Sequence, residues 1–236
     1  MKKGQIFLIP CPLGEVAPMT VLPLTVLKVI EGTDHYVVEH EKNARRFIKS
    51  ICPQKNQAEL KLSTINKFTD PLEIPELIQP CLEGFDLGII SDAGCPGVAD
   101  PGAEIIHIAH KYGIKIVPLV GPSSILLALM ASGLNGQKFA FHGYLPIDKD
   151  ERKQSLKQLE KQSQQEGQTQ IFIETPYRNN QLLEAMTKSL KGDTLLCVAC
   201  NLTLQDEFIL SQEVNLWQPA AHDLHKKPCI FLFLAK

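Results

Sequence analysis

The stretch Ser91-Asp92-Ala93-Gly94-Cys95-Pro96-Gly97-Val98-Ala99-Asp100-Pro101-Gly102 follows directly on the apolar run Leu87–Ile90, and a helical pattern begins after it at Ala103. A glycine-rich loop between a strand and a helix exposes main-chain amides and carbonyls at the carboxyl edge of a parallel sheet, where open α/β sheets bind ligands. Asp92 and Asp100 can accept hydrogen bonds from a ligand or cap the next helix. Taken alone, these residues also fit a turn that binds nothing.

Strand-like runs alternate with helical patterns through the first half of the chain. Strands are predicted near residues 6–9, 35–39, 60–65, 87–91 and 114–119, and helices at 23–30, 43–51, 74–82, 103–112 and 123–131. Such alternation predicts a parallel sheet covered by helices.

The pattern changes after the segment Ser132-Gly133-Leu134-Asn135-Gly136. Strands are predicted at 139–144, 170–174, 195–199, 207–214 and 229–234, and helices at 151–165 and 180–190. The last three strand-like runs are not each separated by a helix, which predicts a mixed sheet with antiparallel strands. We therefore expect two α/β domains, residues 1–134 and residues 135–236.

Composition narrows the class of protein. The 236 residues are 44% hydrophobic and 21% charged, which predicts a globular fold. No apolar run approaches the roughly 20 residues that cross a bilayer, and no signal-peptide cleavage site follows Met1, so a soluble cytoplasmic protein with no membrane partner is expected. The seven cysteines are odd in number and scattered, which favours reduced thiols.

Charge argues mildly against a nucleic-acid-binding protein, because the net charge is −2 and such proteins usually present a basic face. Two local clusters are basic despite the negative net charge, one between Lys42 and Lys55 and the other between Lys149 and Lys161. Each can equally be a solvated helix face, and acidic residues dilute the second.

Common cofactor and metal motifs are missing from the sequence. The first strand leads into Ile9-Pro10-Cys11-Pro12-Leu13-Gly14 instead of a dinucleotide fingerprint, and no phosphate loop or nucleophile elbow is present. Cys197 and Cys200 lie in a predicted strand, where positions three apart point to opposite faces, so they do not make a metal pair. His107 and His110 share a helix face but have no evident third ligand, so no metal is expected.

Two further loops resemble the first in placement. The strand at 114–119 runs into Val120-Gly121-Pro122-Ser123-Ser124, where either serine can cap the following helix. The strand near 170–174 ends in Glu174-Thr175-Pro176-Tyr177-Arg178, where Glu174 and Arg178 can form a simple salt bridge.

In this order, the loops resemble the tetrapyrrole methylase superfamily of S-adenosylmethionine-dependent methyltransferases, and most closely its ribosomal RNA small subunit methyltransferase I branch. The matching motifs span nearly the whole chain and lie at residues 6–14, 91–102, 117–124, 132–134, 139–146 and 171–178. The resemblance implies two α/β domains with the methyl donor in the cleft between them, and a homodimer.

The resemblance also assigns site residues. The binding site for the cofactor S-adenosylmethionine would be formed by Leu13, Gly14, Ser91, Asp92, Ala93, Gly94, Val98, Ser123 and Ser124. The acceptor would meet Glu39, Asp100, Tyr144, Glu174 and Arg178. A ribose hydroxyl needs its proton removed during methyl transfer, and Asp92 and Glu174 are the candidate catalytic carboxylates.

The chain departs from the branch pattern at positions that concern the acceptor. Glu39-His40-Glu41-Lys42 stands where the branch has E-D-T-R, and Cys200-Asn201-Leu202-Thr203-Leu204 stands where it has R-E-L-T-K. The leading expectation is methylation of a ribose 2′-oxygen of small-subunit ribosomal RNA, with that RNA or the small subunit as partner. The alternatives are methylation of a tetrapyrrole or another small molecule, and a donor-binding or ribosome-associated protein without catalysis.

Overall fold

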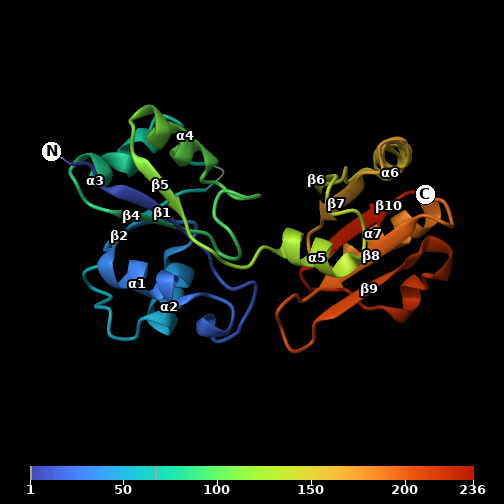
Figure 1. Ribbon diagram of the computed structural model, residues 1–236, viewed down its shortest axis with the longest axis horizontal. Helices are drawn as coiled ribbons and strands as arrows, with labels where there is room; N and C mark the ends of the chain where they lie inside the picture. The colour runs from blue at the N-terminus through green and yellow to red at the C-terminus, as the bar shows by residue number, and fades with distance from the viewer. Residues whose placement is uncertain (1, 67) are drawn as a thin grey trace. The chain divides into compact units, whose positions relative to one another are not determined.

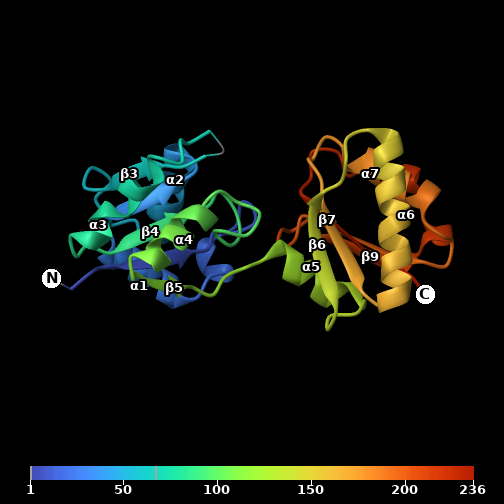
Figure 2. The ribbon, with the colours of Figure 1, turned by 90° about the horizontal axis from the view of Figure 1, so that it is seen from above.

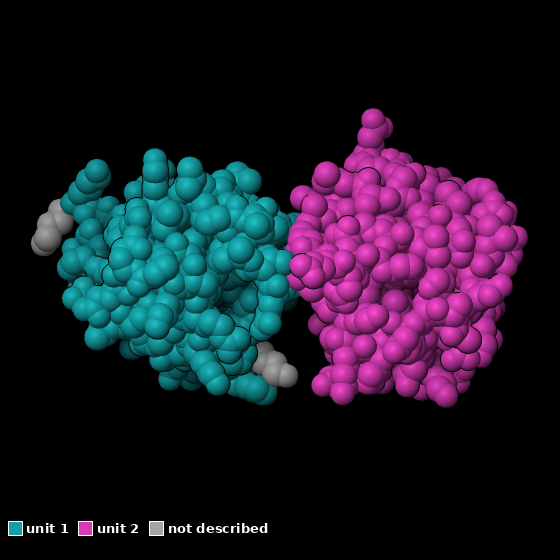
Figure 3. Space-filling model, turned by 90° about the horizontal axis from the view of Figure 1, so that it is seen from below, with its two compact units in different colours: residues 1–123 teal, residues 124–236 magenta. Residues whose placement is uncertain are grey.

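A computed structural model describes residues 2–66 and 68–236. The chain forms two compact units, residues 1–123 and residues 124–236 (Figure 3). The helix α5 (Ser124–Ser132) contacts strands β8, β9 and β10 of the second unit, so it belongs with that unit. The sequence pattern instead predicts this helix in the first domain, with the boundary at the far end of the helix near Leu134.

The first unit contains a parallel sheet, as the alternating pattern predicted. Its strands are β1 (Gln5–Ile9), β2 (His35–Val38), β3 (Lys61–Thr64), β4 (Leu87–Ile90) and β5 (Lys115–Pro118). They lie in the order β3-β2-β4-β1-β5, and each neighbouring pair is parallel. The carboxyl ends of all these strands therefore meet at one edge of the sheet.

Helices cover both faces of this sheet (Figures 1 and 2). The helices α1 (Leu24–Gly32) and α2 (Glu41–Ile51) pack on one face. The 3₁₀-helix η2 (Ile74–Ile78) and the helices α3 (Gln79–Leu82) and α4 (Ala103–Lys111) pack on the other. The helix predicted at 74–82 is thus two short elements, and Pro75 and Pro80 lie at their first turns.

Successive side chains of the buried strand β4 pack into different cores on the two faces of the sheet. Ile89 packs with the core under η2 and α4, whereas Ile90 packs with the core under α1 and α2. The chain leaves β1 toward α1 on one face and leaves the neighbouring β4 toward α4 on the opposite face. Adjacent strands whose connections part in this way form the switch point where open α/β sheets bind ligands.

The second unit contains the mixed sheet that the sequence predicted. Its strands are β6 (Phe139–Tyr144), β7 (Thr169–Ile173), β8 (Leu195–Cys200), β9 (Phe208–Glu213) and β10 (Cys229–Leu234), in the order β6-β7-β10-β8-β9. Only β6 and β7 pair in parallel; the remaining described pairs are antiparallel. Helices α6 (Lys149–Glu166) and α7 (Asn179–Ser189) cover one face, and Figure 2 shows α5 on the other side.

Three short 3₁₀-helices are not predicted by the sequence pattern: η1 (Pro18–Thr20), η3 (Val214–Leu216) and η4 (Pro219–Ala221).

No helix in the described part of the chain is both long and apolar enough to span a membrane. All seven cysteines are free thiols, and all but Cys95 are buried. Within the described residues, no cluster of three or more histidine, cysteine, aspartate or glutamate side chains could hold a metal ion.

Candidate functional site

Two main-chain hydrogen bonds join the loop after β1 to the loop after β4. The amide of Cys11 donates to the carbonyl of Gly94 at 2.9 Å, and the amide of Gly94 donates to the carbonyl of Cys11 at 3.1 Å. This isolated antiparallel pair lies beyond the ends of two parallel strands. It fixes the two loops at the switch point of the sheet.

The loop after β5 is attached to the same group. The Sγ of Cys95 lies 3.4 Å from the carbonyl oxygen of Pro122, to which it donates. Gly121 packs so closely on Pro10 that a Cβ atom at Gly121 would lie 2.3 Å from the proline ring. Three loops from neighbouring strands are therefore packed together.

Gly94 lies at the centre of this arrangement in a conformation that favours glycine. Its φ is +73°, and a Cβ at this position would lie 3.3 Å from the side chain of Leu13 and 3.7 Å from the carbonyl oxygen of Pro122. A larger residue would combine backbone strain with crowding. Ala99 in the same loop also has a positive φ, of 61°. Such strain is common where a loop is shaped for a ligand.

The loop after β2 holds Asp92 at two points. The Oε1 of Glu39 accepts a hydrogen bond from the amide of Asp92 at 3.0 Å. The Nδ1 of His40 lies 2.7 Å from the Oδ2 of Asp92. The Asp92 side chain is still 37% exposed, so its carboxylate is both oriented and accessible. The sequence motif located Asp92, but nothing local in the sequence connects it to His40.

Asp100 adds a third carboxylate to Glu39 and Asp92. Burial, followed by repulsion from Glu39 and Asp92, raises the pKa of Asp100 from 3.8 to about 6, against an opposing hydrogen bond from Ser91. Burial and the same three carboxylates also raise the pKa of the Cys11 thiol, which is therefore held protonated. Three carboxylates gathered at these loops suit a ligand with a positively charged centre.

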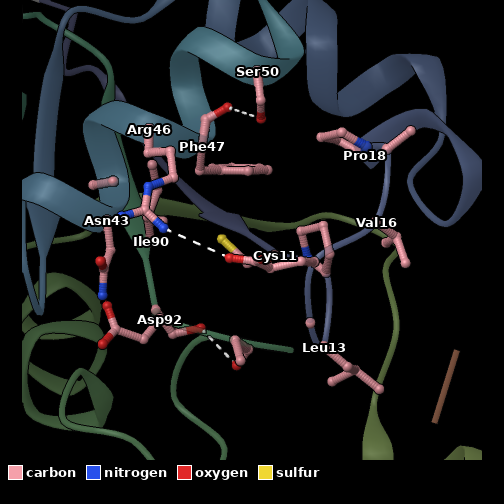
Figure 4. Close-up of a pocket in the computed structure, with 17 residues that line it drawn as sticks. Cys11, Leu13, Val16, Pro18, Asn43, Arg46, Phe47, Ser50, Ile90 and Asp92 are labelled. Atoms are coloured by element: carbon pink, nitrogen blue, oxygen red, sulfur yellow. Dashed lines mark hydrogen bonds and ion pairs between the residues drawn. The ribbon is translucent and has the colours of Figure 1, made fainter. Parts of the chain in front are cut away.

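A pocket of about 520 Å³ opens beside these loops (Figure 4). One wall is the segment from Cys11 to Pro18, the opposite wall is α2, and the chain from Ile90 to Ala93 closes the end. Leu13, Gly14, Ser91, Asp92 and Ala93, all assigned to the donor in the sequence analysis, line it. Arg46 and Phe47 of α2 also line the pocket, and the sequence does not identify either as a site residue. The only sequence signal is the basic cluster to which Arg46 belongs.

The other predicted residues lie in several places. Val98 is 49% exposed in the loop after β4. Ser123 ends the first unit, and Ser124 begins α5 in the second. Tyr144 is the last residue of β6 and is 59% exposed.

Glu174 and Arg178 form the salt bridge that was the simpler expectation for this motif. The Oε1 of Glu174 accepts hydrogen bonds from the Nε of Arg178 at 3.1 Å and from its Nη2 at 2.7 Å. The amide of Thr175 donates to the same oxygen at 2.6 Å. The Glu174 side chain is only 1% exposed. These contacts anchor the start of α7.

The loops of the first unit fit S-adenosylmethionine. Asp92 and Ala93 are exposed and line the pocket, so a ligand can approach the main chain there, whereas Gly94 is buried and shapes the loop. The adenine, ribose and amino acid parts of the donor need directional hydrogen bonds, which exposed peptide groups supply. Its sulfonium suits the carboxylates of Glu39, Asp92 and Asp100.

The sequence matches the model of the family Tetrapyrrole (Corrin/Porphyrin) Methylases over residues 5–215. The chain belongs to the tetrapyrrole methylase family. The sequence resemblance is thereby confirmed. Membership in this family, together with the names of the relatives described next, supports a methyltransferase whose methyl donor is S-adenosylmethionine.

Curated relatives within this family are called ribosomal RNA small subunit methyltransferase I. The one from Bacillus subtilis strain 168 is 33% identical over 207 residues, which cover 87% of this chain and 66% of the relative. The one from Vibrio cholerae serotype O1 is 29% identical and covers 86% and 67%, and that from Escherichia coli O157:H7 is 30% identical and covers 85% and 66%. This chain thus spans about two thirds of their length.

Solved structures confirm the fold of a tetrapyrrole methylase. The methyltransferase CobJ superimposes with a TM-score of 0.64 at 14% identity, over 99% of this chain and 100% of that protein. The uroporphyrin-III-C-methyltransferase from Thermus thermophilus superimposes with a TM-score of 0.58 at 18% identity, over 99% and 93%. At these identities the likeness concerns the fold alone.

Proposed function

We propose that this family member transfers the methyl group of S-adenosylmethionine to a ribose 2′-oxygen of small-subunit ribosomal RNA, in the cytoplasm. The observation that carries the donor half is the group of three packed loops after β1, β4 and β5, with the carboxylates of Glu39, Asp92 and Asp100 beside them. The acceptor half is supported by the relatives' printed names, at about 30% identity over most of the chain.

The residues that would hold the donor belong to the three loops, except for the last, which begins α5: Leu13, Gly14, Ser91, Asp92, Ala93, Gly94, Val98, Ser123 and Ser124. When bound, S-adenosylmethionine supplies a methyl carbon activated by a positively charged sulfur. Methyl transfer requires an aligned donor and acceptor, and fixed orientation of this kind can lower a barrier by roughly 7–11 kcal/mol. The Cys11–Gly94 pair and the Gly121–Pro10 contact supply such rigidity at the loops.

Asp92 is the better-supported candidate for the proton acceptor. Its carboxylate is accessible, and His40 and Glu39 fix its orientation. Glu174 is buried and shared between Arg178 and the Thr175 amide, so we propose for it a structural role at the start of α7. The proton of the ribose hydroxyl would pass to Asp92 as the oxygen attacks.

The proposed function is tested with small ribosomal subunits from a strain that lacks this chain. Incubation with methyl-labelled donor should put label into the RNA, and mass analysis of its nucleosides should find a 2′-O-methylated ribose. Calorimetry with S-adenosylhomocysteine provides the separate test of donor binding. Donor binding without label in the RNA rejects the RNA acceptor and leaves a small-molecule acceptor or a non-catalytic role. Absence of donor binding rejects the whole proposal.

We also propose a homodimer, which the family resemblance implies. The side chains of Leu126 and Met130 on α5 are 51% and 79% exposed, so apolar surface is available on that helix. Sedimentation equilibrium measures the mass directly, and a mass equal to one chain across micromolar concentrations would reject the dimer.

A further inference from the structure

The pocket beside the donor loops has one wall, on α2, whose residues are not assigned to donor binding. Asn43, Ala44, Arg46, Phe47 and Ser50 of α2 line it. Their spacing of three and four residues places them along one side of the helix. The wall therefore presents an aromatic ring, a cation and two polar side chains to a single space of about 520 Å³.

Arg46 is the cation of α2 that lines this pocket. Its side chain is 66% exposed and makes a long ion pair, at 4.0 Å, with Glu15, which also lines the pocket and whose side chain is 99% exposed. The neighbouring Arg45 points elsewhere, because its guanidinium donates to the carbonyl of Gln57 at 2.7 Å. Lys55 is also engaged, at 2.7 Å from Asp34.

Phe47 contributes an aromatic surface at the same place. It is half-buried, so one side of the ring packs against the core of the first unit while the rest lines the pocket. Figure 4 shows the ring extending from α2 into the space between the helix and the segment that holds Cys11 and Pro18. Asn43 and Ser50 lie on either side of it along the helix. The Ser50 hydroxyl donates to the carbonyl of Phe47 at 2.7 Å, so it can accept a hydrogen bond from the edge of a planar ligand, whereas the Asn43 amide can donate or accept one.

We propose that this pocket receives one nucleotide of the acceptor RNA, with the base against Phe47 and the phosphate near Arg46. Proteins hold unpaired bases in this way, by stacking on aromatic rings and by pairing arginine with phosphate. The inference rests on the proposed function. It adds that recognition of the acceptor begins on α2, next to Asp92, which lines the same pocket.

The adenosine of the methyl donor shares part of this chemistry, so the test separates the two ligands. Arg46→Gln removes the cation, and Phe47→Leu removes the aromatic face but keeps an apolar side chain against the core. Lys49→Gln is the matched control, because Lys49 is an exposed cation of the same helix that does not line the pocket. Circular dichroism establishes that each variant is folded.

Two quantities are measured for each protein: the KM for small ribosomal subunits lacking the modification, and the dissociation constant for S-adenosylhomocysteine. We expect each pocket variant to raise the KM about tenfold, as the loss of a base stack or a phosphate contact does, and Lys49→Gln to change it less than about twofold. The dissociation constant should be unchanged in all variants.

Three results would overturn the inference in distinguishable ways. An unchanged KM in both pocket variants, with an active parent protein, shows that the nucleotide lies elsewhere while the RNA function stands. A parallel loss of S-adenosylhomocysteine binding assigns the pocket to the donor. If the parent protein binds S-adenosylhomocysteine but methylates no ribosomal RNA, the proposed function fails and the nucleotide pocket is rejected with it.

Discussion

The Nδ1 of His40 and the Oδ2 of Asp92 lie 2.7 Å apart, so a residue of the loop after β2 orients a carboxylate of the loop after β4. Glu39, the residue before His40, accepts the main-chain hydrogen bond of the same aspartate. Two consecutive residues thus fix both the backbone and the side chain of Asp92. His40 stands where the resembled branch has an acidic residue, and it contributes a hydrogen-bonding ring at that position.

Replacing Asp92 with alanine should weaken donor binding. A hydrogen bond to a charged group contributes about 1.5–3 kcal/mol, so the dissociation constant for S-adenosylhomocysteine should rise about tenfold or more. Titration calorimetry measures it. Asp150→Ala, at an exposed position in the first turn of α6, is the control and should bind as the parent does. An unchanged affinity in Asp92→Ala would show that the loop is misassigned.

Gly94→Val should abolish donor binding because its side chain would crowd Leu13, which a Cβ at Gly94 already approaches to 3.3 Å. This crowding can be separated from backbone strain by a control variant. Gly133 has nearly the same φ, +71° against +73°, but a Cβ there has nothing within 4 Å. A β-branched residue at a positive φ costs about 1–3 kcal/mol, so both valine variants should be less stable in urea than the parent. Only Gly94→Val should lose S-adenosylhomocysteine binding. Loss of binding in Gly133→Val as well would point to general destabilisation.

The raised pKa of Asp100 predicts how stability changes with pH. Burial, with Glu39 and Asp92, raises this pKa from 3.8 to about 6 in the folded chain, so the folded state holds a proton that the unfolded state has released. Stability from this group is present below pH 3.8 and is lost as the pH rises through about 6. Asp100→Asn should therefore become the more stable protein by about 1 kcal/mol at pH 7.5, after allowance for solvent screening, and show no advantage at pH 3.5.

Urea unfolding of the two proteins across this pH range measures the difference. An advantage of Asp100→Asn that is equal at both ends of the range would contradict titration of Asp100 as its cause.

Glu174→Gln should reduce stability because it leaves the partly buried Arg178 without its carboxylate. Breaking a buried pair by removing one partner is strongly destabilising, and we expect a loss of about 2 kcal/mol in urea unfolding. The matched control is Glu184→Gln, which breaks an exposed pair with Lys188 at the same spacing on α7 and should leave stability unchanged. A Glu174→Gln protein of normal stability that had lost methyl transfer would instead return Glu174 to the catalytic candidates.

The elements of the fold follow from the sequence because each has a local cause. Alternating apolar runs predict the parallel sheet of the first unit, and the three strand-like runs after α7 predict the antiparallel part of the second. The short 3₁₀-helices do not carry enough periodic residues to be predicted. The sequence pattern groups α5 with the first domain, whereas the structure groups it with the second unit. That grouping depends on contacts with β8 to β10, which lie far along the chain.

The site divides in the same way. Glycine and proline spacing locates the loop of Asp92 and Gly94, since these residues act through their own backbone. The contact of Asp92 with His40 depends on β2 lying next to β4, and strand order is not visible in local sequence. Likewise, the sequence shows a basic cluster around Arg46, but only the packed helix shows which of its cations faces the pocket.

Cys11 stands between Pro10 and Pro12, so it has the only main-chain N–H of these three residues, and that N–H is the one donated to Gly94. Two pyrrolidine rings also limit the shapes this segment can take before folding, so less chain entropy is lost when the loop closes. A library that randomises position 11 should therefore tolerate many small side chains yet reject a third consecutive imino acid.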